Sequence, residues 1–227
     1  MEPAKGLLNQ IRFLFIHELK LEWKNKYAIN GILLYVTGAV FICYMSFNVK
    51  KGIIHPITWN ALFWIIILFS AVNAIAKSFI GQKEGRNLYY YLLVRPEALI
   101  LAKMIYNALL LIVLSVLGLI FYSVVMGNPV QDMAMFIAAL LLGCIGLACS
   151  LTLISGIAAK AGGNMALMSI LSFPVILPVI LLVIKVSKSA IDGIDRSISY
   201  DEMIVLSALN AIIIAVCRML FPYLWRN

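Results

Sequence analysis

The chain has 227 residues, of which 63% are hydrophobic and only 12% are charged, and its formal net charge is +8. A composition this apolar lies outside the range of soluble globular proteins and predicts an integral membrane protein. The apolar segments leave no room for a soluble catalytic domain. The four cysteines lie inside or at the ends of apolar runs without a C-x-x-C pair, so we expect neither disulfides nor a metal site.

Six apolar runs follow one another along the chain, and each is close to or longer than the roughly 20 residues that cross a bilayer. They predict an all-α membrane protein with a domain of six transmembrane helices in residues 27–227. The predicted spans are residues 27–47, 59–76, 98–126, 134–157, 165–186 and 203–221. An even number of spans puts both termini on the same side.

Positive charge is concentrated on one side of these spans. All but five of the 18 Lys and Arg residues lie in the segments on the terminal side, which the positive-inside rule assigns to the cytoplasm. The five on the other side are Lys50, Lys51, Lys185, Lys188 and Arg196, and they are balanced by Asp132, Asp192, Asp195, Asp201 and Glu202. We therefore expect both termini in the cytoplasm. Basic flanks against an anionic lipid leaflet explain the surplus charge, so no nucleic-acid partner is expected.

Residues 1–26 precede the first span and predict an amphipathic helix along the cytoplasmic leaflet. On a helical wheel, Leu7, Ile11 and Leu14 belong to a broad apolar arc opposite a polar sector. Glu18 and Glu22 fall within that arc, four residues apart, where an unpaired charge is costly. We expect them to meet cations of another cytoplasmic segment; the alternative is that they reach out to water.

Residues 77–97 join the second and third spans on the predicted cytoplasmic side and are themselves partly apolar. Three consecutive tyrosines, Tyr89, Tyr90 and Tyr91, stand beside Leu92 and Leu93. This composition favours a short helix with a docking face over a solvated tether.

The sequence predicts no catalytic residues. The Gly-Lys dipeptide of a phosphate-binding loop is absent, and the predicted spans contain no Asp, Glu or His. If ATP is used, a partner subunit hydrolyses it. We expect this chain not to be an enzyme and to hold no cofactor of its own.

We interpret the polar residues within the spans as structural before we consider a binding role for them. Asn73, Asn107 and Asn210 lie in three different spans, and we expect them to face the bundle interior and join helices, with substrate binding as the alternative. The small residues of the fourth span predict a packing helix. His55, in the outer loop between spans one and two, is interpreted as a solvated loop residue, with axial ligation of haem as the alternative.

Two features of the fourth and fifth spans predict irregular backbone. Gly162 and Gly163 are expected at a tight cytoplasmic turn between these spans, where positive φ or close helix approach favours glycine. Pro174 and Pro178 lie four residues apart, near one face of the fifth span. Each removes a backbone donor, so they predict a kink.

Three stretches carry a resemblance to a known family. They are HELKLEW at His17 to Trp23, the region from Phe79 to Lys103, and above all KAGGNMALMSILSFPVILPVILLVI at Lys160 to Ile184. The basic residue, glycine pair and apolar helix with two prolines resemble CcmB, the haem exporter B permease of bacterial cytochrome c maturation, an ABC-2-type membrane domain. Ala161 stands where the family often has a second basic residue, and tyrosines replace the usual acidic coupling stretch.

The resemblance implies a six-helix permease in the bacterial inner membrane. It would dock on a CcmA-like ATPase and work beside CcmC-like and CcmD-like membrane subunits and a CcmE-like haem chaperone. Glu84, Gly85, Tyr89 and Tyr90 would then be ATPase-coupling residues. ATP hydrolysis would drive haem export or release of the loaded chaperone, with haem as a cargo of the complex. The tryptophan-rich haem motif of CcmC is not in this sequence.

Two other classes of function stay open at this point. An ABC-2 permease could instead move a lipid, a drug or another substrate. A membrane scaffold without transport would have no stable ATPase partner.

Overall fold

The computed structural model describes residues 6–25, 27–48, 54–75, 77–80, 94–161 and 165–226. Within these residues the regular structure is entirely helical. The helices are α1 (Leu7–Asn25), α2 (Tyr27–Asn48), α3 (Pro56–Ile75), α4 (Lys77–Ile80), α6 (Pro96–Met126), α7 (Met133–Lys160), α8 (Met165–Asp192) and α9 (Arg196–Arg226).

Five of the described helices, α3, α6, α7, α8 and α9, are long and apolar enough to cross a membrane. They coincide with the predicted second to sixth spans. The α2 helix has 22 residues, with an apolar stretch over Leu33–Phe47, and its role as a further span stays a prediction.

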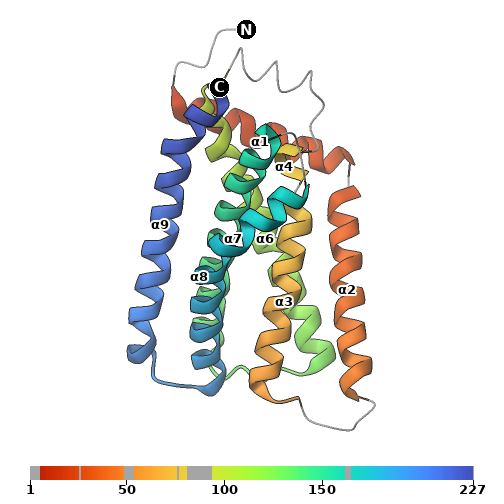
Figure 1. The fold of residues 1–227 in the computed structure, drawn as a ribbon. Coiled ribbons are helices and arrows are strands. Elements are labelled where there is room, and N and C mark those ends of the chain that lie inside the picture. Colours follow the sequence, from red (N-terminus) through yellow and green to blue (C-terminus); the bar gives the residue numbers. More distant parts are fainter. Residues whose placement is uncertain are drawn as a thin grey trace.

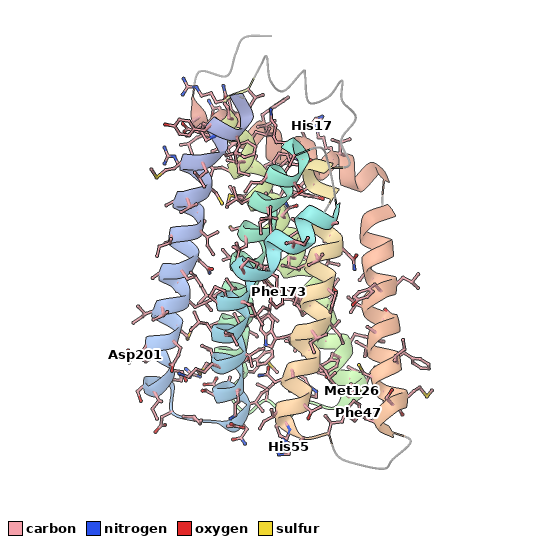
Figure 2. All side chains as sticks on the ribbon, in the orientation of Figure 1. His17, Phe47, His55, Met126, Phe173 and Asp201 are labelled. Carbon is pink, nitrogen blue, oxygen red and sulfur yellow. The ribbon has the colours of Figure 1, made fainter. Side chains whose placement is uncertain are left out.

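The long helices run alongside one another, while α1 lies across one end of them (Figure 1). The last turns of α9 reach that same end, here called the α1 end. The connection between α8 and α9 lies at the opposite end, here called the loop end. His17 and His55 mark these two ends in Figure 2.

The connection between α8 and α9 is shorter than the sequence suggested. The predicted fifth span ends at residue 186 and the predicted sixth begins at residue 203, but α8 continues to Asp192 and α9 begins at Arg196. Gly193, with φ of 65°, makes the turn, a conformation that glycine adopts without strain. Charged residues end the apolar runs here, but the helices continue through these charged residues. Lys185 and Glu202 even pair across the two helices, with Nζ 2.8 Å from Oε1.

The helix at the centre of the bundle is α7, which packs against α6, α8 and α9. Of its most apolar stretch, 72% is buried, against 44% or less for the other four candidate spans. Its glycines permit this contact. A Cβ added at Gly143 would lie 2.9 Å from Val183 Cγ2, and one at Gly146 would overlap Asn210 Oδ1. The prediction that small residues make this a packing helix is confirmed.

Aromatic side chains fill the interior toward the loop end. Trp59 and Phe63 of α3 stack with ring centroids 5.8 Å apart, and Tyr122 of α6 lies 4.8 Å from Trp59. Their polar atoms are bonded as well as buried, since Trp59 Nε1 donates to the Gly127 carbonyl at 2.9 Å and the Tyr122 hydroxyl donates to the Trp59 carbonyl at 3.1 Å. These bonds fix the depth of α3 against α6.

An ion pair ties the start of α7 to the start of α9. Asp132 caps α7 by accepting from the Met135 amide at 3.1 Å. It also accepts from Arg196 Nε at 2.6 Å and from Arg196 Nη2 at 2.9 Å, in the two-pronged geometry typical of Arg and carboxylate. The hydrogen bond from Arg196, followed by that from the Met135 amide, lowers the pKa of Asp132.

Asp132→Ala should lower the thermal midpoint of unfolding by a few degrees because it removes both the cap and the ion pair. Asp132→Asn keeps a capping side chain, so its difference from wild type isolates the ion pair. Since the pKa of Asp132 is lowered from an ordinary value near 3.8, the contribution of the ion pair is complete above about pH 4 and declines below it. Thermal unfolding of both variants between pH 7 and pH 3 measures this. A destabilisation by Asp132→Asn that grows on acidification would contradict the assignment.

Candidate functional site

A lysine is buried inside the helix bundle at the α1 end. Lys103 lies seven residues after the start of α6, and its side chain is 2% exposed. An ammonium group removed from water is stable only if its charge is compensated and its donors are bonded. Its environment therefore has to provide both a negative charge and hydrogen-bond acceptors.

Two helices, α1 and α4, provide what the ammonium needs. Glu18 of α1 places Oε1 at 3.2 Å from Lys103 Nζ. The Ser78 carbonyl of α4 accepts a hydrogen bond from the same nitrogen at 2.6 Å. The Phe79 ring lies with its centroid 4.7 Å from it, at cation–π distance. The prediction that Glu18 meets a cation of another segment is confirmed; the side chain of Glu22 lies outside the described residues.

One turn further along α6, Asn107 extends the contacts to α7. Its Nδ2 donates to Ser78 Oγ at 3.1 Å and to Thr152 Oγ1 at 2.8 Å. The backbone amide of Phe79 donates to Ser155 Oγ of α7 at 3.3 Å. The carbonyl and the hydroxyl of Ser78 thus both bind α6, and α4 is held against α6 and α7 together. We call Glu18, Ser78, Phe79, Lys103, Asn107, Thr152 and Ser155 the Lys103 cluster.

The apolar side of α1 rests on the same part of the bundle. Leu14 is buried, and Leu7 and Ile11 pack partly buried against the core. One turn before Leu14, Gln10 Oε1 accepts from the Arg95 amide at 3.3 Å, at the residue that precedes α6. The predicted apolar arc of this helix therefore faces the protein along Leu7, Ile11, Leu14 and Glu18, and the glutamate within it meets the buried lysine.

The predicted coupling segment, residues 77–97, begins at this cluster. Residues 81–93, with Glu84, Gly85, Tyr89 and Tyr90, lie outside the described residues, and so do Gly162 and Gly163. The flanks of the segment are described. The α4 helix leads into it through Ser78 and Phe79, and Val94 and Arg95 lead out of it into α6.

Both prolines of the fifth span lie inside α8. Pro174 and Pro178 are exposed on one face of the helix. Figure 1 shows the first turns of α8 inclined to the rest of the helix. Phe173, beside the first proline, lies midway between the two ends of the bundle in Figure 2.

The interhelical role predicted for the span asparagines holds for two of the three. Asn107 joins α6 to α4 and α7, and Asn210 Nδ2 donates to the Leu142 carbonyl of α7 at 2.9 Å. The expectation for Asn73 is wrong, because its side chain is exposed on α3. The reason is helical phase: Asn73 lies on roughly the opposite face of α3 from the buried Asn60 and Ile67.

A second polar site, in the loop-end half of the bundle, was not predicted from the sequence. Asn60 and Trp64 of α3 share one helix face and meet Ser187 of α8. Asn60 Oδ1 accepts from Ser187 Oγ at 2.9 Å, and Trp64 Nε1 donates to Ser187 Oγ, also at 2.9 Å. The i, i+4 spacing of Asn and Trp within an apolar run was the available signal.

His55 has a structural partner at the start of α3. Its Nδ1 accepts from the Ile57 amide at 3.4 Å, and its carbonyl accepts from the Trp59 amide at 3.0 Å. The side chain is exposed at the loop end. These contacts are those of a residue that caps a helix.

Together these features define a multi-pass helical membrane protein with a buried polar cluster at one end. A family model described as CcmB protein matches residues 9–223 of the chain. The chain belongs to this family and is thus a membrane permease subunit of an ABC complex for cytochrome c maturation, in which an ATPase and other membrane subunits take part. The comparisons with curated proteins and with solved structures found no match.

Glu18→Gln should destabilise the protein by about 3–5 kcal/mol, because it leaves the buried charge of Lys103 uncompensated. The double variant Glu18→Gln with Lys103→Met should recover most of that loss, since both charges are then absent. Equilibrium unfolding of the purified protein measures the coupling between the two positions. Lys185→Met breaks an ion pair whose lysine is 67% exposed and, as the matched control, should change stability by about 1 kcal/mol or less. Simple additivity of the Glu18 and Lys103 effects would show that the two side chains do not interact.

Proposed function

We propose that this chain carries the motion of a separate ATPase subunit into the membrane through residues 77–97. In this proposal the ATPase contacts the segment that includes Glu84, Gly85, Tyr89 and Tyr90. The Lys103 cluster then passes a displacement of α4 to α1, α6 and α7. The motion drives haem export or the release of a haem-loaded chaperone.

The observation that carries the proposal is the way α4 is held. This four-residue helix directly precedes residues 81–93, and its backbone and side chains form hydrogen bonds with two longer helices, α6 and α7. Such contacts exchange poorly with water, because each broken one leaves a buried polar group or a buried charge unpaired. A displacement of residues 81–93 therefore moves α4 together with the helices that it contacts and does not unfold α4.

The proposal includes an orientation in which the α1 end faces the cytoplasm of a bacterial inner membrane and α2 crosses it as a sixth span. Exposed basic residues at this end support it, namely Arg12, Lys20, Lys160 and Arg218. The outward face of α1 also combines Leu8, 80% exposed, with Arg12 and Lys20. Apolar and basic residues together suit a helix that touches the lipid headgroup region.

The α7–α8 connection is a second part of the proposed path. Gly162 and Gly163 stand between two helices that pack closely on each other, and Pro174 and Pro178 follow in α8. A helix that lacks two backbone donors bends more easily than a regular one. Motion that enters at the α1 end would be taken up by this bend.

The experiment replaces the two tyrosines of the segment. Tyr89→Ala with Tyr90→Ala should reduce co-purification of the ATPase about tenfold or more, because aromatic side chains that fill a partner's groove carry much of a binding energy. Tyr223→Ala, at a 75% exposed tyrosine of α9 at the same end, is the matched control and should leave binding unchanged. Unchanged ATPase binding in the double variant would refute the docking assignment.

The cluster itself is tested by function rather than by binding. Glu18→Gln should leave the ATPase bound but lower holocytochrome formation in cells, since the docked segment is then poorly connected to α1 and α6. Unchanged holocytochrome formation in this variant, with the ATPase still bound, would show that the cluster is not the link.

A further inference from the structure

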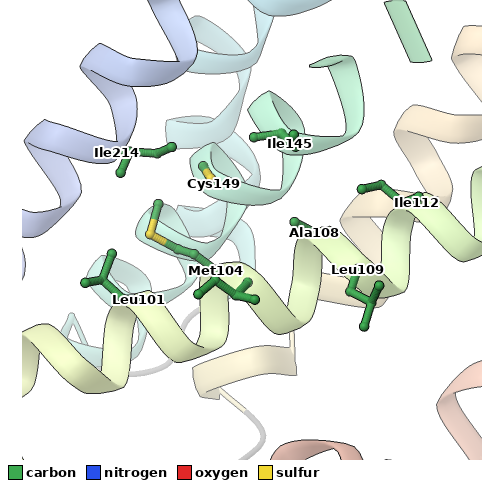
Figure 3. A pocket seen from close by; sticks show the side chains of 9 residues that line it. Leu101, Met104, Ala108, Leu109, Ile112, Ile145, Cys149 and Ile214 are labelled. Atoms are coloured by element: carbon green, nitrogen blue, oxygen red, sulfur yellow. The ribbon is translucent and has the colours of Figure 1, made fainter. Parts of the chain in front are cut away.

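A groove opens on the side of the bundle between α6, α7 and α9. Its volume is about 390 Å³, and Figure 3 shows its lining from Leu101 to Ile112 on α6, with Cys149 of α7 and Ile214 of α9 opposite. The lining is aliphatic apart from the sulfur atoms of Met104 and Cys149. Apolar cavities of this kind exclude water and accept apolar ligands.

The groove has the length of one lipid leaflet. Leu101 and Ile112 are separated by eleven residues, or about 16 Å along the helix axis. The hydrocarbon of a bilayer is ~30 Å thick, so one leaflet contributes ~15 Å. The groove therefore begins near the α1 end of the bundle and ends near mid-membrane, which matches the path of a single acyl chain.

Two opposite charges stand at the α1-end mouth of the groove. Arg218 follows Ile214 by one turn on α9, and Glu97 precedes Leu101 by one turn on α6. Arg218 Nε lies 3.8 Å from Glu97 Oε2, beyond hydrogen-bond distance, and their side chains are 59% and 40% exposed. Both groups are therefore accessible to a ligand while remaining neighbours.

We propose that this groove binds a phospholipid whose headgroup carries a primary amine, with one acyl chain between α6 and α9. The guanidinium of Arg218 binds the phosphate through parallel N–H donors. The Glu97 carboxylate accepts from the ammonium of the same headgroup. A choline headgroup has no N–H to donate to Glu97, and an anionic glycerol headgroup brings no positive charge to it. The charge pair thus selects the zwitterionic, amine-bearing class.

The test titrates detergent-purified full-length protein with dioleoyl phosphatidylethanolamine, phosphatidylcholine or phosphatidylglycerol and records the thermal midpoint. A ligand that binds the folded state raises this midpoint in a saturable way. We expect half-saturation by phosphatidylethanolamine at a concentration about tenfold below that of the other two, the factor that one charge-assisted hydrogen bond gives. Equal half-saturation by all three lipids, stronger binding of phosphatidylglycerol, or no saturable effect would overturn the proposal.

Variants separate the headgroup from the chain. Glu97→Gln should abolish the preference for phosphatidylethanolamine over phosphatidylcholine, and Arg218→Gln should weaken the binding of both lipids. Arg12→Gln, at an exposed arginine of α1, is the control for general surface charge and should change neither the preference nor the binding.

Ala108→Phe should fill the groove and remove saturable binding of every lipid, and Ala108→Leu serves if that protein does not fold. Val124→Phe, at a 79% exposed residue of α6 outside the groove, should leave binding unchanged. Saturable binding that survives a filled groove would show that the lipid binds elsewhere. The inference does not depend on the coupling role of residues 77–97, because none of these measurements involves the ATPase.

Discussion

The burial of one positive charge organises the α1 end of this protein. Lys103 is 2% exposed, and its ammonium is tolerated there because Glu18 compensates its charge and the Ser78 carbonyl accepts a hydrogen bond from it. Each of these partners comes from a different helix. The chain cannot bury Lys103 without also placing α1 and α4 against α6. A hydrophobic residue in place of the lysine would pack as well, but it would not specify which helices meet.

The two halves of the bundle are held by different polar groups. Toward the α1 end, Asn107 and Thr152 continue the Lys103 cluster into α7. Toward the loop end, Asn60 and Ser187 join α3 to α8. Between them α7 relies on small residues and close packing. Lipid offers little driving force for helix association, so such bonds and close contacts determine which helices are neighbours. The interior of the α1 end contains a buried ion pair, whereas the interior toward the loop end contains neutral groups and aromatic rings, and the cations of the ion pairs there are exposed.

Much of this architecture could be predicted from the sequence, because hydropathy, charge asymmetry and helical phase are local properties. The helices match the predicted spans within a few residues except at charged ends, where α9 begins at Arg196 rather than near 203. Glu18 was predicted to meet a cation because a charge within an apolar arc requires one. Lys103 could not be chosen from among the cytoplasmic cations, since the contact depends on where α1 crosses α6. Asn73 was misplaced because the sequence gives the phase of α3 but not the face that its neighbours cover.

The central claim is that α1, α4, α6 and α7 move as one body when the ATPase acts. Electron–electron distance measurements between spin labels at Asn9 of α1 and Ala161 at the end of α7, both exposed positions, test it in the complete complex. The account predicts one narrow distance distribution that is the same without nucleotide and with ATP bound, and a broad one after Glu18→Gln. A distance that changes with ATP while Glu18 and Lys103 are intact would contradict it.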